Sequence, residues 1–291
     1  MLQIPFYKYQ GLGNDFVLFD QVADAGIALP NAEVIQRICD RRFGIGADGL
    51  LFFAPASQAN AVRMIYFNAD GSRAETCFNG LRCIARHAVR SGRFSCGSDF
   101  LIETDANPLH ASVEAGEGGL IRMEMPGPAL EPERIPVNSR EQVVNRELYF
   151  DGIRLTGTAL SLGNPHFVVW HEEPGLDELN RMVVQLGATV EHSPHFPKGT
   201  NFELAHRLDD ATVEMAVWER GVGRTLACGS GATATVCVGV ITGSLPPGKP
   251  VIVRMAGGEI KIMITEDLSS SIVIGPAKFV FSGILDSEKW Q

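Results

Sequence analysis

Two cysteines occupy equivalent places in two copies of one sequence motif. The first copy, from Phe67 to Cys83, reads FNADGSRAETCFNGLRC, and the second, from Trp218 to Cys237, reads WERGVGRTLACGSGATATVC. At an offset of 151 residues, Cys77 aligns with Cys228. Each copy follows an alternating apolar run, which predicts a strand, a glycine-bearing turn and a Cys-x-x-Gly start to a helix. The sequence thus predicts one cysteine at a helix start in each half.

The predicted position of the two cysteines favours acid/base chemistry. The free N–H groups and the dipole at a helix N-terminus lower the pKa of a thiol. The same N–H groups form a double anion site suited to one carboxylate; they belong to Phe78, Asn79, Gly229 and Ser230. If the halves face each other, one thiolate can remove an α-proton while the opposing thiol protonates the other face. This two-base racemisation needs no cofactor, and we expect none.

Further polar residues recur where predicted strands meet turns. Asn14 in GLGND and Asn164 in SLGNP lie 150 residues apart, and a weaker match aligns Gly46 with Gly199 and Asp48 with Asn201. Asparagine in such places is a common turn former, but its recurrence in both halves makes a binding role an equal alternative. The candidates for such a role are Asn14, Asn68, Asn164 and Asn201. His166 could be structural or could hold a nearby thiol ionised, and Glu219 and Arg220 could simply be a solvated pair.

The elements that carry these residues predict an α+β protein of two pseudo-symmetric halves. Each half is expected to wrap a mostly antiparallel or mixed sheet round a central helix, because the helix from Ala232 to Ile241 is apolar nearly all round. We expect the halves to be residues 1–130 and 137–276, joined by a Pro-rich linker at Met125–Pro136. A last strand, within about 277–291, is expected to return to the first half.

Two helices of the first half are predicted in more detail. Asn31 should cap a helix that has Arg41 and Arg42 in its last turn. In the helix after Cys77, Arg82 is expected on the polar face, opposite an apolar stripe. The remaining cysteines are interpreted as structural; they are Cys39, Cys83, Cys96 and Cys237.

Composition and charge limit the classes of partner that the protein is expected to bind. The formal charge of −9 over 291 residues is spread without long runs of one sign, which argues against a nucleic-acid partner, and no apolar run is long enough to span a membrane. No secretion signal is recognised, so we expect a cytoplasmic protein with reduced thiols. The cysteine spacing predicts neither disulfides nor a metal site. The expected partner is a small amino-acid substrate, and a homodimer is one open alternative for the assembly.

At these residues the chain resembles the diaminopimelate epimerases, which need no cofactor and act in lysine and cell-wall precursor synthesis. The resemblance covers nearly the whole chain, and ERGVGRTLACGSGA is its most specific motif. The other matching motifs are GLGNDF, FGIGAD, FNADGSRAETC with NGLRC, GNPH and TNFE.

The resemblance implies a role for each candidate residue. Cys228 would take the α-proton from the LL isomer and Cys77 would return one, giving the meso isomer. His166 and Glu219 would tune the thiols. The backbone of Phe78, Asn79, Gly229 and Ser230 would hold the reacting carboxylate, and the amino groups and distal carboxylate would be held by Asn14, Asn68, Asn164, Asn201, Glu219 and Arg220.

The sequence departs from the family pattern at two positions. Phe78 stands where a glycine is usual, and Gly49 where a glutamine is frequent. A racemase of another amino acid on the same scaffold is therefore the runner-up. Two other readings are a cysteine hydrolase that uses His166, which leaves the second cysteine without a role, and a non-catalytic amino-acid-binding protein.

Overall fold

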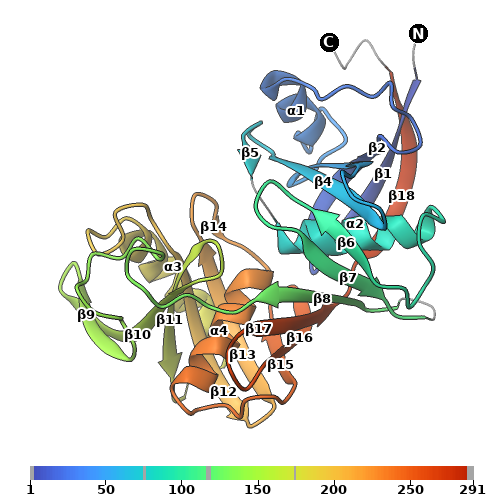
Figure 1. Cartoon of the computed structure of the whole chain (residues 1–291). Coiled ribbons are helices and arrows are strands. Elements are labelled where there is room, and N and C mark those ends of the chain that lie inside the picture. Colours follow the sequence, from blue (N-terminus) through green and yellow to red (C-terminus); the bar gives the residue numbers. More distant parts are fainter. Residues whose placement is uncertain (1–2, 75–76, 116–118, 174, 287–291) are drawn as a thin grey trace. The chain divides into compact units, whose positions relative to one another are not determined.

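A computed structural model describes residues 3–74, 77–115, 119–173 and 175–286 (Figure 1). The chain divides into two compact units, residues 1–123 with 275–291 and residues 124–274. Both units are mixed α/β with more strand than helix, which confirms the predicted fold class. The sequence predicts a first half that ends at residue 130 and a second that begins at residue 137, whereas the division of the structure falls after residue 123.

The first unit wraps a mixed sheet round one helix. Its strands pair in the order β18, β1, β2, β3, β4, β6 and β7, and only the β2–β3 and β4–β6 pairs are parallel. Helix α2 contacts β1, β3, β4, β7 and β18. The elements are β1 (Gln3–Gly11), β2 (Asn14–Asp20), α1 (Ala32–Cys39), β3 (Gly49–Pro55), β4 (Ala61–Asn68), β5 (Arg73–Ala74), α2 (Phe78–Arg90), β6 (Phe100–Glu103), β7 (Leu109–Val113) and β18 (Lys278–Asp286).

The second unit repeats this topology. Its pairing order is β9, β10, β11, β12, β13, β15 and β16, then β17, and its parallel pairs are β11–β12 and β13–β15. The elements are β9 (Arg146–Phe150), β10 (Ile153–Ser161), β11 (Pro165–His171), α3 (Leu176–Glu191), β12 (Asn201–Asp209), β13 (Thr212–Glu219), β14 (Gly223–Arg224), α4 (Gly229–Ile241), β15 (Val251–Met255), β16 (Gly258–Ile264) and β17 (Ser270–Gly275). One more strand, β8 (Ile121–Pro126), spans the boundary between the units.

The central helix of the second unit is buried as its composition predicted. Residues 229–239 of α4 are all buried, and the helix contacts β10, β11, β12, β13 and β16. It begins at Gly229, three residues before the predicted start. A helix that is apolar all round is stable only when strands enclose it, and α4 meets that condition.

The predicted return of the last strand is confirmed. Strand β18 pairs antiparallel with β1, and in Figure 1 the red C-terminal strand lies beside the blue N-terminal one. In the second unit β9 pairs with β10 in the same way. The last strand thus takes the place in the first unit that β9 takes in the second. Residues 287–291 of the predicted strand lie outside the described residues.

The prediction of a linker at Met125–Pro136 is wrong. Gly127 donates to the backbone of Ser269 at 2.9 Å, and Ala129 forms a bridge with Ser161. Ile135 is fully buried and belongs to the core of the second unit. The prolines marked an irregular segment correctly, but composition alone does not show which apolar side chains pack against a core.

We expect Ile135→Ala to lower the free energy of unfolding of the second unit by about 3 kcal/mol, because it removes a buried side chain and leaves a cavity. Urea unfolding followed by tryptophan fluorescence measures this, since Trp170 and Trp218 lie in that unit. The exposed Glu133, in the same segment, is the control position, and Glu133→Ala should change stability little. Equal stabilities of the two variants would show that the segment is not part of the core.

The end of α1 also differs from the prediction. The helix stops at Cys39, as Asp40 adopts an extended conformation and its carboxylate accepts the N–H groups of Arg42 and Phe43 at 2.7 Å. Arg41 therefore follows the helix, and its guanidinium pairs with the carboxylates of Asp15 in β2 and Asp48 just before β3.

Candidate active site

Each unit carries its cysteine at the N-cap of its central helix, as predicted. Cys77 has extended backbone angles (φ −148°, ψ 115°), and its carbonyl accepts the N–H of Leu81 at 2.8 Å as α2 begins. Cys228 has the same role at the start of α4 (φ −124°, ψ 116°). A Cβ on Gly80 would lie 3.0 Å from Leu51, and one on Gly231 would lie 2.7 Å from Glu203. Glycine at these positions lets the first helical turn rest on the sheet.

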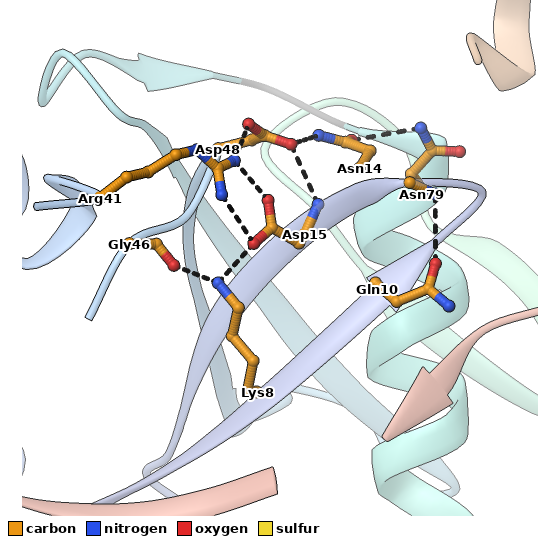
Figure 2. A network of polar contacts seen from close by, with 9 residues as sticks. Lys8, Gln10, Asn14, Asp15, Arg41, Gly46, Asp48 and Asn79 are labelled. Carbon is orange, nitrogen blue, oxygen red and sulfur yellow. Dashed lines mark hydrogen bonds and ion pairs between the residues drawn. The ribbon is translucent and has the colours of Figure 1, made fainter. Parts of the chain in front are cut away.

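The side chain of Asn14 joins Cys77 to a charged network at the start of β2. Figure 2 shows Asn14 and this network. Its Oδ1 lies 3.9 Å from Cys77 Sγ and accepts the Asn79 amide at 3.1 Å, while its Nδ2 donates to Asp48 at 2.7 Å. Because Asp48 fixes the amide nitrogen, the carbonyl of Asn14 faces the thiol. Asn14 Oδ1 is thus placed to accept a hydrogen bond from the Cys77 thiol.

Three further charged residues hold Asp48 and Asn14 in place (Figure 2). Arg41 bonds Asp48 and Asp15 at 2.6 Å each, and Lys8 pairs with Asp15 at 2.6 Å and with the carbonyl of Gly46. Burial works against ionisation of Asp15, but the hydrogen bonds from Arg41 and Lys8 hold its pKa below its ordinary value. Sequence reasoning missed Lys8, Asp15 and Arg41, since no local pattern connects them.

The prediction for Arg82 is wrong, because this side chain is fully buried. Its guanidinium donates to Asn79 Oδ1 at 2.6 Å, to the carbonyl of Phe78 at 3.4 Å and to that of Pro276 at 3.1 Å. The segment that leads into β18 covers the polar face of the helix and supplies the acceptor. Arg82 thereby orients Asn79 so that its Nδ2 points to Asn14.

Asn68, at the end of β4, is fixed by its own neighbours. Tyr66 donates its hydroxyl to Asn68 Oδ1 at 2.7 Å, and Asn68 Nδ2 donates to Ser72 at 3.0 Å. The same tyrosine explains Gly49, where a Cβ would lie 2.7 Å from the Tyr66 ring and 2.4 Å from the carbonyl of Phe67. No side chain fits at residue 49 unless Tyr66 moves.

The Phe78 side chain is buried, with 9% of the residue exposed. A phenyl ring at the first position of α2 therefore has a place within the fold and does not project into solvent. The departure from the family's glycine is accommodated by packing.

In the second unit, burial outweighs the expected effect of the helix start on the thiol. Ser230 Oγ and the N–H of Gly231 lie 3.4 Å from Cys228 Sγ, and both lower its pKa. Burial, and after it the nearby carboxylate of Glu219, raises the pKa by more than these two contacts lower it, so the pKa of Cys228 stands well above its ordinary value. The prediction of a lowered pKa is thus wrong for this cysteine in the substrate-free structure.

Glu219 adjoins the thiol. It ends β13, is hydrogen-bonded to Cys228 and accepts the Thr225 hydroxyl. Burial raises the pKa of Glu219 above its ordinary value, although both of these hydrogen bonds oppose the shift. A carboxylate of raised pKa in contact with a thiol is a base for that thiol.

A chain of polar side chains leads from the interior to Cys228. Glu203 lies 2.7 Å from His166 Nδ1, His166 Nε2 lies 3.0 Å from Asn164 Oδ1, and Asn164 Nδ2 lies 3.3 Å from Ser230 Oγ. Glu203 and His166 are fully buried. Glu203 was not predicted as a site residue, because it lies inside an apolar strand pattern.

Asn201 and Arg220 meet at a neighbouring edge of the same unit. Asn201 accepts the backbone N–H of Arg220 at 2.9 Å and donates to the carbonyl of Pro165 at 2.9 Å. The Arg220 side chain is exposed and donates to the carbonyl of Lys198 at 3.3 Å. Strand register pairs Asn201 with His166 and Gly49 with Phe16, so Asn201 corresponds to Gly49 and not to Asp48.

The structure thus places the candidates in two groups, one in each unit. The first unit joins Cys77, Asn14 and Asn79, with Phe78 at the helix start. The second joins Cys228, Ser230, Glu219, Asn164 and His166, with Gly229 opening the helix. Among the described residues, no cluster of three or more His, Cys, Asp or Glu side chains has the arrangement of a metal site. Nor does any described helix combine the length and hydropathy needed to cross a bilayer.

Comparison with solved structures finds the same fold in an epimerase and in a probable racemase. The structure resembles a hydroxyproline epimerase from Agrobacterium vitis with a TM-score of 0.70 at 12% identity, over 99% of this chain and 97% of that one. It also resembles a probable proline racemase from Agrobacterium radiobacter with a TM-score of 0.71 at 13% identity, over 97% and 93% of the two chains.

Sequence comparison is more specific. The family model for diaminopimelate epimerase matches residues 6–130 and 158–280. The diaminopimelate epimerase of Rippkaea orientalis is 38% identical over 97% of this chain and 99% of its own. That of Carboxydothermus hydrogenoformans is 39% identical over 96% of this chain and 98% of its own. The chain is therefore an isomerase and belongs to the diaminopimelate epimerase family.

Proposed function

We propose that this protein converts LL-diaminopimelate to meso-diaminopimelate, a step of lysine synthesis, by two-base catalysis with Cys228 and Cys77. The observation that carries the proposal is the presence of a cysteine at the N-cap of the central helix in both units of a family member. A hydrolase needs one nucleophile, and a binding protein needs none. Two equivalent thiols match a reaction that moves one proton on each face of a carbon.

The proton steps follow from the groups around each sulfur. Glu219 accepts the proton of the Cys228 thiol, and the thiolate then takes the α-proton, leaving the electron pair on the α-carbon and its carboxylate. Cys77 gives its own proton to the opposite face and becomes a thiolate. Solvent then returns a proton to Cys77 and removes one from Glu219, which restores the starting state.

The two helix starts supply the electrostatic part of catalysis. Backbone N–H groups of Phe78 and Asn79 in one unit, and of Gly229 and Ser230 in the other, are the donors proposed for the α-carboxylate. Negative charge develops on this carboxylate as the α-proton leaves. Fixed donors aimed at that charge stabilise the transition state without reorganising.

The substrate assignment depends on groups that recognise the second, distal centre of diaminopimelate. Arg220 has an exposed guanidinium, which suits a carboxylate bidentately. The fixed amides of Asn68 and Asn201 and the carboxylate of Glu219 are proposed to hold the amino groups and the distal carboxylate. Racemisation of another amino acid is the second candidate, because Phe78 and Gly49 depart from the pattern of the family.

The assay that tests this function incubates the purified, reduced protein with LL-diaminopimelate and follows meso-diaminopimelate by chiral chromatography. The common amino acids are screened in parallel in heavy water for deuterium at the α-carbon. Conversion of diaminopimelate alone supports the proposal. Deuterium exchange into another amino acid, with diaminopimelate untouched, would replace it by the second candidate.

The raised pKa of Cys228 predicts a distinct alkylation profile. An ordinary cysteine ionises near pH 8.5 and reacts as the thiolate. The Cys228 thiol, whose pKa is raised by burial and by Glu219, stays neutral through that range. We expect iodoacetamide labelling of Cys228 in the substrate-free protein, measured by mass spectrometry, to rise only at higher pH. Labelling with a midpoint at or below that of free cysteine would contradict this, and the exposed Cys96 reports reagent activity in the same sample.

A further inference from the structure

One buried carboxyl group near the site has only one of its oxygens paired. Glu203 is 0% exposed, and its Oε1 lies 2.7 Å from His166 Nδ1. Its Oε2 is buried and has no hydrogen-bond partner among the described residues. The space beside Oε1 is closed by α4, where a Cβ on Gly231 would come within 2.7 Å. Glu203 is therefore enclosed by β11, β12 and the first turn of the helix.

The surroundings of Glu203 do not favour an ionised carboxylate. An ionised carboxylate accepts several hydrogen bonds, and burying one with a single partner carries a large cost. The titratable groups that face Glu203 are His166, Glu219 and Cys228, of which only His166 can bring positive charge. Burial raises the pKa of Glu203 above its ordinary value, with His166 opposing. Geometry and surroundings agree on a neutral carboxylic acid.

Glu191, in the same unit, provides the contrast. One of its oxygens accepts the indole N–H of Trp218 and the other the backbone N–H of Gly221, both at 2.7 Å. Two donors on two oxygens are the surroundings of an ionised carboxylate. Glu203 lacks such a pair, so its second oxygen does not have the partner that a negative charge requires.

We propose that Glu203 is a positioning residue that donates its carboxyl proton to His166 Nδ1 and thereby directs a chain of hydrogen bonds onto the sulfur of Cys228. This inference rests on the function proposed above and adds a residue to its site. With Nδ1 as acceptor, His166 keeps its proton on Nε2 and donates it to Asn164 Oδ1, 3.0 Å away. The amide of Asn164 is then fixed with Nδ2 toward Ser230, at 3.3 Å.

The direction of the chain continues to the thiol. Because Ser230 Oγ accepts from Asn164, its own hydrogen is free for Cys228 Sγ, 3.4 Å away. Every donor between Glu203 and Cys228 thus points toward the sulfur, an arrangement that stabilises the thiolate when it forms. A neutral Glu203 does this without adding negative charge beside the thiolate.

Comparison with the first unit shows that this series of hydrogen bonds leads to only one of the two cysteines. At the positions equivalent to His166 and Glu203, the first unit has Phe16 and Leu51, both fully buried. Asn14 is held instead through its nitrogen by Asp48, so its oxygen faces Cys77. The two asparagines therefore present opposite ends of their amides, an acceptor near Cys77 and a donor near Ser230.

The direct test is the tautomer of His166 in the substrate-free protein, measured by ¹⁵N NMR with histidine-labelled protein and assigned with His166→Asn. We expect a neutral ring that carries its proton on Nε2 at neutral pH. A doubly protonated ring, or a ring protonated on Nδ1 alone, would overturn the proposal. This measurement needs no turnover, so its result is independent of whether diaminopimelate is the substrate.

Kinetics of two variants provide the second test. In Glu203→Gln the amide N–H can still donate to His166 Nδ1, so kcat/KM should stay within about threefold of wild type. Glu203→Leu introduces the residue type that the first unit has at the equivalent position, Leu51. The hydrogen-bond donor to His166 Nδ1 is then lost, and kcat/KM should fall about tenfold or more. A matched loss in both variants would show that an ionised Glu203 is required and would overturn the proposal.

A control separates this effect from general damage to the core. Thr235→Val changes a fully buried residue of α4 whose hydroxyl has no hydrogen-bond partner among the described residues, and it should leave kcat/KM unchanged. Glu203→Leu with wild-type kcat/KM and an unaltered His166 spectrum would also reject the role of Glu203.

Discussion

Replacing Cys228 or Cys77 by alanine is expected to reduce kcat/KM for LL-diaminopimelate by about 10³-fold or more, because each change removes one of two proton carriers. Epimerisation is followed by the appearance of the meso isomer. Both variants should remain folded, since a sulfur atom is a small part of either helix start. Near-normal turnover in either variant would remove that cysteine from the mechanism.

The two cysteine variants should differ in deuterium exchange. Cys228→Ala should not exchange the α-proton of the LL isomer, because the base on that face is missing. Cys77→Ala keeps this base and should exchange slowly without inversion. Cys83→Ala, at a fully buried cysteine of the same helix as Cys77, is the matched control and should retain activity. Loss of activity in the control would mean that packing of α2, and not proton transfer, explains the result for Cys77.

Replacing Arg220 by methionine is expected to lower kcat/KM for diaminopimelate by about a hundredfold. If the bound substrate excludes water from Arg220, the loss of this charged partner for the carboxylate costs on the order of 3 kcal/mol, which corresponds to that factor. The exposed guanidinium bonds only weakly to its own chain, at 3.3 Å from the Lys198 carbonyl, so little folding energy should be lost. Steady-state kinetics and a thermal melt of the same preparation measure both effects.

The matched control for Arg220→Met is Arg154→Met, because Arg154 is an arginine of the same unit with a side chain 65% exposed. It should leave kcat/KM unchanged. If wild-type protein also racemises an amino acid with a single carboxylate, that activity should resist the Arg220 change. Equal losses of kcat/KM for substrates with one carboxylate and with two would show that Arg220 has a structural role. Arg220 would then give no reason to choose diaminopimelate as the substrate.

The sequence predicted the helix starts because each cysteine sits in a repeated local pattern. A strand, a glycine turn and Cys-x-x-Gly are sufficient to place Cys77 and Cys228, and the short asparagine repeat placed Asn14 and Asn164. Arg82 could not be predicted, because its position on the helix is that of a surface residue and its acceptor at Pro276 comes from a segment far along the chain. Burial by distant segments is not visible in helical periodicity.

The raised pKa of Cys228 could not be predicted from the sequence either. A helix start alone lowers the pKa of a thiol, but the opposite shift follows from burial and from the carboxylate of Glu219 at the end of β13. The role of Glu203 could not be predicted either, because in the sequence it is a single polar residue inside an apolar strand. Only the folded structure shows that Glu203 contacts His166 and the first turn of α4.

The central claim is that two different groups handle the protons on the two faces of the α-carbon. It is tested most directly by converting LL-diaminopimelate in heavy water and analysing both isomers by mass spectrometry at low conversion. Two-base catalysis predicts one deuterium in the meso product and none in the remaining LL isomer, because Cys77 delivers a solvent-derived proton. Meso product that retains the original hydrogen would show that a single base moves the proton between faces and would contradict the account.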